Sequence, residues 1–157
     1  MLTIFGTGHR PEDAGGLSVE DMHLLCCTAI AQATTPITTI ISGAAAGFDL
    51  AIAQAAVFLN INLIIAKPWA GHKFRVADRG DWGKILSYPR TTLHVVNESE
   101  EYPGPGAYQD RNRWMVDNAN AGLALWNGKL SGGTYNCLKY AESVHKPVRN
   151  IFPKLVG

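Results

Sequence analysis

The chain has 157 residues, of which 46% are hydrophobic and 17% charged, with 16 glycines and a formal net charge of +1. This length suits one domain with a full hydrophobic core, and the composition excludes a disordered chain. Because the charges nearly balance, a general attraction to nucleic acid or to a membrane surface is excluded, and any recognition of an anion must be local. We therefore expect a single globular domain over residues 1–157.

The N-terminus leads directly into an apolar strand, without the basic segment and long apolar core of a signal peptide. No apolar run reaches the length of a membrane span. Cys26, Cys27 and Cys137 show no metal-ligand spacing, so we expect buried thiols in a reducing compartment. These features predict a cytoplasmic protein, and nothing in the sequence calls for a metal or a cofactor.

Strands and helices alternate along the chain. In chain order the expected elements are strand Leu2–Gly6, helix Val19–Thr34 with Ser18 as its N-cap, strand Ile37–Ile41, helix Phe48–Leu59, strand Asn62–Ala66, strand Thr91–Val96, helix Tyr108–Ala119, strand Gly122–Trp126, helix Tyr135–Val144 and strand Pro147–Phe152. The stretch His72–Tyr88 is left open, because Gly80 and Gly83 weaken it as a helix. This alternation predicts an α/β, Rossmann-like three-layer sandwich, with a mainly parallel sheet and helices on both faces.

The expected helix Phe48–Leu59 is apolar nearly all round, with Asp49 and Gln54 as its polar interruptions. A helix without a polar face needs cover on more than one side, so it is either sandwiched or forms a subunit interface. Because a small sheet domain covers such a helix poorly, we expect a homo-oligomer, a dimer or higher, through Phe48–Leu59.

Three strand exits carry turns of small residues. The turn Thr7-Gly8-His9-Arg10 follows the first strand, residues 42–47 follow the second, and Gly132-Gly133-Thr134 follows the fifth. The exits of parallel strands share one rim, and ligands bind there where the strand order reverses. Glycine permits close approach of the backbone, the Thr134 hydroxyl can cap the helix that follows, and a helix N-terminus attracts phosphate. We therefore predict an anion site at this rim.

The expected helix Tyr108–Ala119 carries Arg111 near its start, with Asn112 beside it and Met115 one turn further on. A guanidinium binds phosphate through two hydrogen bonds, and a neighbouring amide can take a hydroxyl or a base edge. The alternative is a solvated charged helix that places Met115 in the core. Hydride transfer is disfavoured, because no acidic residue closes the second strand and the first turn lacks the third glycine of a dinucleotide fingerprint.

Together the motifs resemble a known superfamily. Thr7-Gly8-His9-Arg10-Pro11, Ser42-Gly43-Ala44-Ala45-Ala46-Gly47-Phe48-Asp49, Arg111-Asn112-x-x-Met115-Val116-Asp117 and Gly132-Gly133-Thr134 resemble the SLOG superfamily, most nearly its YpsA-like branch. The superfamily includes LOG-type enzymes that hydrolyse the N-glycosidic bond of nucleoside monophosphates, DprA proteins that bind single-stranded DNA, and sensors of nucleotide signals, NAD-derived ones included.

The resemblance implies phosphate contacts from Gly8, Gly43 and residues 132–134, with Arg111 as the matching arginine and Asp49 and Asp117 near the pocket. LOG-type enzymes have a glutamate shortly after the glycine turn. Here the first carboxylate after Thr134 is Glu142, which starts more than ~10 Å along the helix. Binding without chemistry is therefore the leading hypothesis.

The expected ligand-binding residues are Thr7, Gly8, His9, Arg10, Ser42, Gly43, Ala44, Gly47, Asp49, Arg111, Asn112, Met115, Gly132, Gly133 and Thr134. The ligand is a nucleotide or a nucleotide-derived molecule, and the chain acts as a sensor, sponge or subunit. The alternative is a nucleoside-monophosphate N-glycosidase with Arg111, Asp117 or Asp49 as catalytic residues. Single-stranded DNA binding is third, and the net charge of +1 makes nucleic acid an unexpected partner.

Overall fold

A computed structural model describes residues 1–153 of the chain. Six parallel strands form one sheet: β1 (Leu2–Gly8), β2 (Ile37–Ser42), β3 (Asn62–Lys67), β4 (Thr91–Val95), β5 (Ala121–Leu125) and β6 (Val148–Asn150). Their order across the sheet is β4-β3-β2-β1-β5-β6. The chain therefore adds strands outward from β1 on one side and then crosses to the other side with β5.

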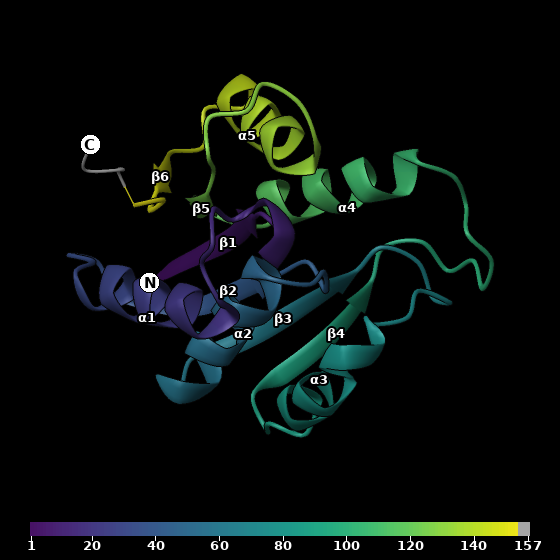
Figure 1. Cartoon of the computed structure of the whole chain (residues 1–157), viewed down its shortest axis with the longest axis horizontal. Coiled ribbons are helices and arrows are strands. Elements are labelled where there is room, and N and C mark those ends of the chain that lie inside the picture. Colours follow the sequence, from purple (N-terminus) through teal and green to yellow (C-terminus); the bar gives the residue numbers. More distant parts are fainter. Residues whose placement is uncertain (154–157) are drawn as a thin grey trace.

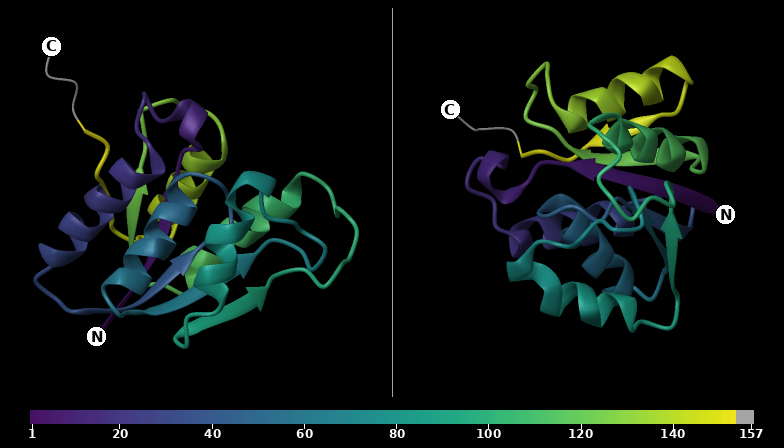
Figure 2. Two further views of the ribbon diagram at one scale, coloured as in Figure 1. Left: turned by 60° about the horizontal axis from the view of Figure 1, so that its bottom comes forward. Right: turned by 90° about the vertical axis from the view of Figure 1, so that its right-hand side faces the viewer.

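Helices cover both faces of this sheet. They are α1 (Val19–Ala31), α2 (Phe48–Phe58), α3 (Arg79–Leu86), α4 (Gly106–Asp117) and α5 (Gly133–Ser143). Figures 1 and 2 show α1, α2 and α3 on one face and α4 and α5 on the other. The predicted α/β, Rossmann-like three-layer sandwich is confirmed, and its sheet is parallel throughout.

The alternation of side chains along the strands divides the core between the two faces. On β2, Ile40 belongs to the cluster under α1 and α2, whereas its neighbour Ile41 belongs to the cluster under α4 and α5. Phe48 and Met115 are fully or almost fully buried in these two clusters, respectively. Each such side chain contributes about 1.5–3 kcal/mol, so the two cores fix the helices that frame the sheet edge.

A local signal accounts for the start of α1, whereas packing accounts for the helix in the stretch that the sequence leaves open. Ser18 Oγ accepts the Asp21 N–H at 3.0 Å and Asp21 accepts the Ser18 N–H at 3.0 Å, so the predicted cap is a full capping box. Two glycines lie within α3, yet the helix forms because Trp82 and Ile85 are 1% and 3% exposed against the core. Packing of one apolar side therefore outweighs the low helix propensity of glycine.

The apolar helix α2 is sandwiched within the chain. It packs on β1, β2 and β3 and lies between α1 and α3, and eight of its residues are buried. Only Phe58, at its C-terminal end, exposes a large apolar side chain, with 73% of its surface accessible. The chain itself supplies the cover that the expectation assigned to a second copy, so α2 no longer argues for an oligomer, and the homo-oligomer stays a prediction. Within residues 1–153, no helix is both long and apolar enough to cross a membrane.

Candidate functional site

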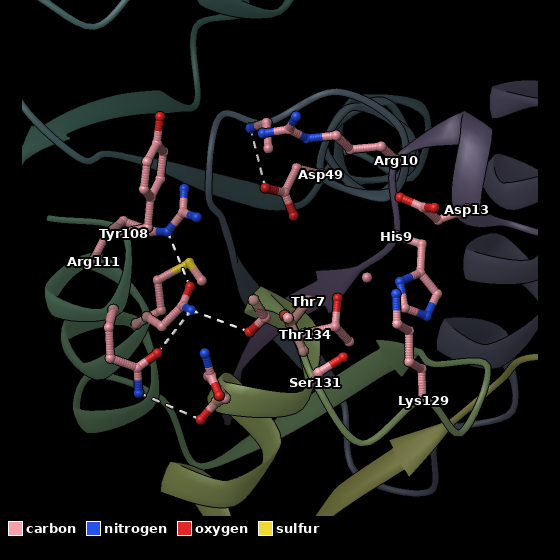
Figure 3. Close-up of a pocket in the computed structure, with 18 of the residues that line it drawn as sticks. Thr7, His9, Arg10, Asp13, Asp49, Tyr108, Arg111, Lys129, Ser131 and Thr134 are labelled. Atoms are coloured by element: carbon pink, nitrogen blue, oxygen red, sulfur yellow. Dashed lines mark hydrogen bonds between the residues drawn. The ribbon is translucent and has the colours of Figure 1, made fainter. Parts of the chain in front are cut away.

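A pocket of about 480 Å³ lies at the carboxyl edge of the sheet. It opens where the strand order reverses between β1 and β5, which is the usual ligand position in open α/β sheets. The exits of β1, β2 and β5 contribute to its walls, and α4 closes one side. Figure 3 shows the side chains of Arg10, Asp49 and Arg111 at one end of the pocket and those of Thr7, Ser131 and Thr134 at the other. The predicted convergence of three strand exits is therefore present.

Hydrogen bonds connect the turn after β1 with the turns after both neighbouring strands, β2 and β5. His9 Nε2 accepts a hydrogen bond from the Asn127 N–H at 3.0 Å, and the His9 carbonyl accepts the Phe48 N–H at 3.1 Å. Burial lowers the pKa of His9, so the ring is neutral near pH 7 with its proton on Nδ1. Gly47 has φ +80°, and a Cβ there would lie 2.5 Å from the His9 carbonyl oxygen. Only glycine fits this junction between the two turns.

Arg111 connects α4 with the exit of β2. Its side chain is only 8% exposed; Nη1 donates to the Gly43 carbonyl and Nε donates to Asn112 Oδ1 at 3.1 Å. Asn112 in turn donates from Nδ2 to the Gly133 carbonyl at 3.4 Å, beside the start of α5. These contacts hold one buried cation at a fixed place in the pocket wall, between the β2 turn and the N-terminus of α5.

Asp49 lies next to this cation in the first turn of α2. Its Oδ2 accepts the Ala45 N–H at 3.1 Å, and its backbone carbonyl accepts Ser42 Oγ at 2.6 Å. Burial raises the pKa of Asp49 to about 6, although Arg111, the Ala45 N–H and Arg10 each favour the ionised form. The pocket therefore contains a carboxyl group that gains or loses its proton only slightly below neutral pH.

The N-terminus of α5 forms the opposite end of the pocket. The helix begins at Gly133, after Gly132 with φ +93°, and no side chain caps its first turn. Thr134 was expected to cap the helix but lies inside its first turn, because the helix starts two residues earlier than the expected Tyr135. The first-turn N–H groups of a helix point outward from its end, so this end presents free donors and a partial positive charge to the pocket.

Most of the predicted site residues line this pocket. Those that do are Thr7, Gly8, His9, Arg10, Asp49, Arg111, Asn112, Met115, Gly132, Gly133 and Thr134. Four others shape the β2 turn behind it: Ser42, Gly43 and Gly47 make the contacts described above, and Ala44 lines a neighbouring cavity.

Asp117, a candidate catalytic residue, does not line this pocket. It is exposed, and its Oδ1 accepts the Tyr140 hydroxyl at 2.7 Å on the side of α4 that faces α5. Six residues after Arg111, at 100° per residue, a side chain points about 120° away from the arginine. Of the three candidate catalytic residues, Asp49 and Arg111 therefore line the pocket and Asp117 does not.

The predicted ligand-binding set omits part of the lining. The additional residues are Asp13, Ala45, Pro105, Tyr108, Gln109, Asn127, Lys129, Ser131 and Asn136. Tyr108 could have been found from its spacing, because it precedes Arg111 by three residues and so shares its helix side. The residues between β5 and α5 carry no such signal, since a loop has no periodicity.

Comparisons with solved structures identify the same fold. DNA processing protein A (DprA) from Streptococcus pneumoniae superposes with a TM-score of 0.72 and 14% identity over 98% of this chain and 52% of that one. DprA from Helicobacter pylori, described for its single-stranded DNA binding mode, superposes with a TM-score of 0.70 and 16% identity, over 94% of this chain and 64% of that one. The structural-genomics target TM1055 superposes with a TM-score of 0.60 and 14% identity, over 94% of this chain and 72% of that one. The chain thus spans about half to two thirds of the DprA chains, and at 14–16% identity these neighbours show the shared fold.

No family model matches the chain. A prophage-derived protein of Bacillus subtilis, the uncharacterized SPbeta protein YoqJ, is 32% identical over 120 residues, which cover 67% of this chain and 70% of YoqJ. At that identity and coverage, the chain belongs to the same protein family as YoqJ.

Proposed function

We propose that this chain is a nucleotide-binding domain of the SLOG superfamily, most nearly of its YpsA-like branch. It binds a phosphorylated nucleoside between the exits of β1 and β5 and acts as a sensor, sponge or subunit. The observation that carries the proposal is that the uncapped N-terminus of α5 and the buried guanidinium of Arg111 line one pocket. Free helix amides and a fixed guanidinium are a recurrent combination for phosphate.

The phosphate lies at the start of α5 in this proposal. The amides of Gly133 and Thr134 donate to it, and Lys129 lies on the same pocket wall with no side-chain partner recorded within residues 1–153. Asp49 opposes an anion only when it is ionised, and its raised pKa lets the neutral form persist to about pH 6. Phosphate binding therefore favours the protonated state of Asp49.

The base stacks on Tyr108, which lines the pocket and is 37% exposed. Trp69 packs against this ring edge to face, with centroids 5.5 Å apart, and so fixes its orientation. Stacking on an aromatic ring contributes about 1–3 kcal/mol for any base, so the identity of the base must be read by polar groups. Gln109 and Asn112, on the same helix as Tyr108, are two of the side-chain amides that line the pocket.

Titration calorimetry with the four ribonucleoside 5′-monophosphates tests the proposal. The unmodified chain is expected to bind at least one of them at one site per chain, and Arg111→Ala to weaken that binding at least tenfold, which is about 1.4 kcal/mol. Arg113→Ala is the matched control, because Arg113 is exposed on the same helix and its guanidinium lies over the Tyr140 ring. Absence of binding, or equal loss in both variants, contradicts the proposal.

The second candidate is hydrolysis of the N-glycosidic bond of the bound nucleotide. Asp49 favours it, because a carboxyl group with a pKa of about 6 beside a guanidinium can protonate the departing base, and the carboxylate so formed can take up the proton of the water that attacks C1′ of the sugar. Chromatography of incubated nucleoside monophosphates then shows free base, and Asp49→Asn abolishes its release while nucleotide still binds. If the unmodified chain releases no base, binding alone remains.

Single-stranded DNA is the third candidate. The near-neutral charge argued against nucleic acid, but the likeness to a DprA structure described for its single-stranded DNA binding mode makes that exclusion doubtful. At 16% identity the likeness concerns the fold, so we keep DNA as an arm of the experiment. A labelled oligonucleotide whose affinity falls with rising salt supports this candidate, and one that does not bind removes it.

A further inference from the structure

A second cavity of about 290 Å³ adjoins the first. It shares Arg10, Ala45, Tyr108 and Arg111 with the pocket described above and extends toward the connection between β3 and α3. We call this cavity the basic annex. Its walls are formed by Arg10 and Arg111, by the alanines 44–46 of the β2 turn, and by His72, Lys73 and Arg75. The small alanine side chains leave the space open, and the longer side chains bring charge to it.

Positive charge exceeds negative charge in the basic annex. Arg10, Lys73, Arg75 and Arg111 line it against one carboxylate, Glu12, which pairs with Arg75 at 3.6 Å while both side chains are about half exposed. The structure records no hydrogen bond or ion pair for the side chains of Arg10 and Lys73 within residues 1–153. Four cations around an open cavity repel one another more than one carboxylate offsets, and an anionic guest reduces that repulsion.

His72 lies among the same positive charges. Its ring lines the annex, and its pKa is lowered to about 4, first by burial and then by the charges of Arg111, Lys67 and Arg10. Its buried Nδ1 has no hydrogen-bond partner in the described part of the chain. The ring is therefore neutral near pH 7, although it borders a space that favours negative charge.

We infer that the ligand carries a second phosphate group, held apart from the first, which occupies the basic annex between Arg10, Lys73 and Arg75. This inference rests on the proposed function, in which the first phosphate lies at the start of α5. Tyr108 lines both cavities and stands where the nucleoside links the two phosphates. The ligand class is thus a nucleoside bisphosphate or a dinucleotide.

An acidic loop limits the number of phosphates. The Gly71 N–H donates to the Ser99 carbonyl at 3.2 Å, which places Glu98, Glu100 and Glu101 beside the segment that enters the annex. Exposed carboxylates on this neighbouring loop disfavour a chain of phosphates that continues beyond the annex. A small ligand with two phosphate groups therefore fits the annex better than a long single strand.

Calorimetry with matched probes tests the inference. The probes are the ribonucleoside 5′-monophosphates, the corresponding nucleoside 3′,5′-bisphosphates, 5′-phosphorylated dinucleotides and a dT oligonucleotide. We expect a probe with two phosphates to bind about tenfold tighter than its monophosphate, as one set of charge-assisted hydrogen bonds provides. Lys73→Ala combined with Arg75→Ala removes that gain and leaves the monophosphate affinity within about twofold, whereas Lys84→Ala, an exposed lysine on α3, changes neither.

One further variant and three possible outcomes test the second-phosphate inference, the proposed function and the ligand class separately. Glu12→Gln frees Arg75 from its ion pair and is expected to tighten bisphosphate binding about threefold. If monophosphate and two-phosphate probes bind equally, the inference fails while the proposed function stands. If neither binds to the unmodified chain, the proposed function fails, and the inference fails with it. Tighter binding of the oligonucleotide than of both two-phosphate probes overturns the small-ligand class.

Discussion

The guanidinium of Arg111 donates a hydrogen bond from Nη1 to the backbone carbonyl of Gly43. This contact joins α4, on one face of the sheet, to the exit of β2 that leads into α2, on the other face. It also holds a buried cation beside the carboxyl group of Asp49, because both side chains approach the same glycine. The geometry of the pocket therefore depends on Gly43, because a side chain at this position would meet both groups.

Gly43→Ala is expected to disturb this arrangement. A Cβ at position 43 would lie 2.8 Å from Arg111 Nη1 and 2.9 Å from Asp49 Oδ2, so both groups must move. We expect a loss of about 1–3 kcal/mol in the free energy of unfolding and weaker nucleotide binding. Urea unfolding and calorimetry measure the two effects. Gly83→Ala is the control: a Cβ there meets nothing within 4 Å, so a helical alanine should stabilise the chain by about 0.5–1 kcal/mol.

Arg111→Lys is expected to fail as a replacement even though it keeps the charge. One ammonium group cannot contact the Gly43 carbonyl, Asn112 Oδ1 and a phosphate in the geometry of the guanidinium. We predict about a tenfold loss in nucleotide affinity, measured by calorimetry. Arg113→Lys, on the exposed side of α4, should leave the affinity unchanged. Equal binding by Arg111→Lys and the unmodified chain contradicts a phosphate contact of the guanidinium.

Stability should depend on pH through Asp49. Its pKa is raised from 3.8 to about 6, so the folded state binds this proton more tightly than the unfolded state between those values. The free energy of unfolding therefore falls by about 3 kcal/mol from this group as pH rises from about 4 to about 6. Asp49→Asn removes that fall, so the stability of the variant relative to the unmodified chain should rise over this range and then level off.

Urea unfolding of the two proteins at several pH values measures this difference. The pKa of His72 is lowered to about 4, so His72 contributes the opposite slope, because its neutral folded form is favoured as pH rises toward 6.5. That contribution is common to both proteins and cancels in the difference. A difference that stays constant from pH 4 to pH 6 contradicts the raised pKa of Asp49.

Tyr108→Ala should weaken binding of every base to a similar extent. The exposed ring lines the pocket and stacks without reading the edge of the base, so the expected loss is about 1–3 kcal/mol for each nucleotide bound. Tyr108→Phe keeps the ring and should bind normally. Tyr102→Ala is the control, since Tyr102 is 57% exposed in the same aromatic cluster but does not line the pocket. A loss confined to one base would show that Tyr108 reads an edge instead.

The fold was predictable because its strands are short apolar runs bounded by turn residues, as in Ile37–Ser42, and because parallel strands place all their exits at one edge. The same reasoning placed Gly8, Gly132 and Arg111 around one pocket. That prediction depended on the order of the strands along the chain and on the small residues that follow them, and a sequence shows both directly.

The remainder depended on packing that a sequence does not show. Trp82 and Ile85 fold α3 from a stretch weakened by glycines, and only that fold brings Lys73 and Arg75 to the basic annex. The strand order also explains why α1 and α3 cover α2. Strands β2, β3 and β4 follow one another on one side of β1, so the helices that precede them, α1, α2 and α3, lie side by side on one face of the sheet. Asp117 was expected near the pocket from its place in a motif, but the helical period turns its side chain away from Arg111 and toward Tyr140.

Amide NMR during a nucleotide titration tests the central claim most directly, because it reports where a phosphorylated nucleoside binds. We predict that the backbone amide signals of Gly133 and Thr134, at the uncapped start of α5, shift and saturate at one ligand per chain, whereas the signal of Gly83 in α3 does not move. Inorganic phosphate should shift the same amides more weakly. Signals at Gly133 and Thr134 that stay unchanged while the nucleotide binds elsewhere, or does not bind, would contradict the account.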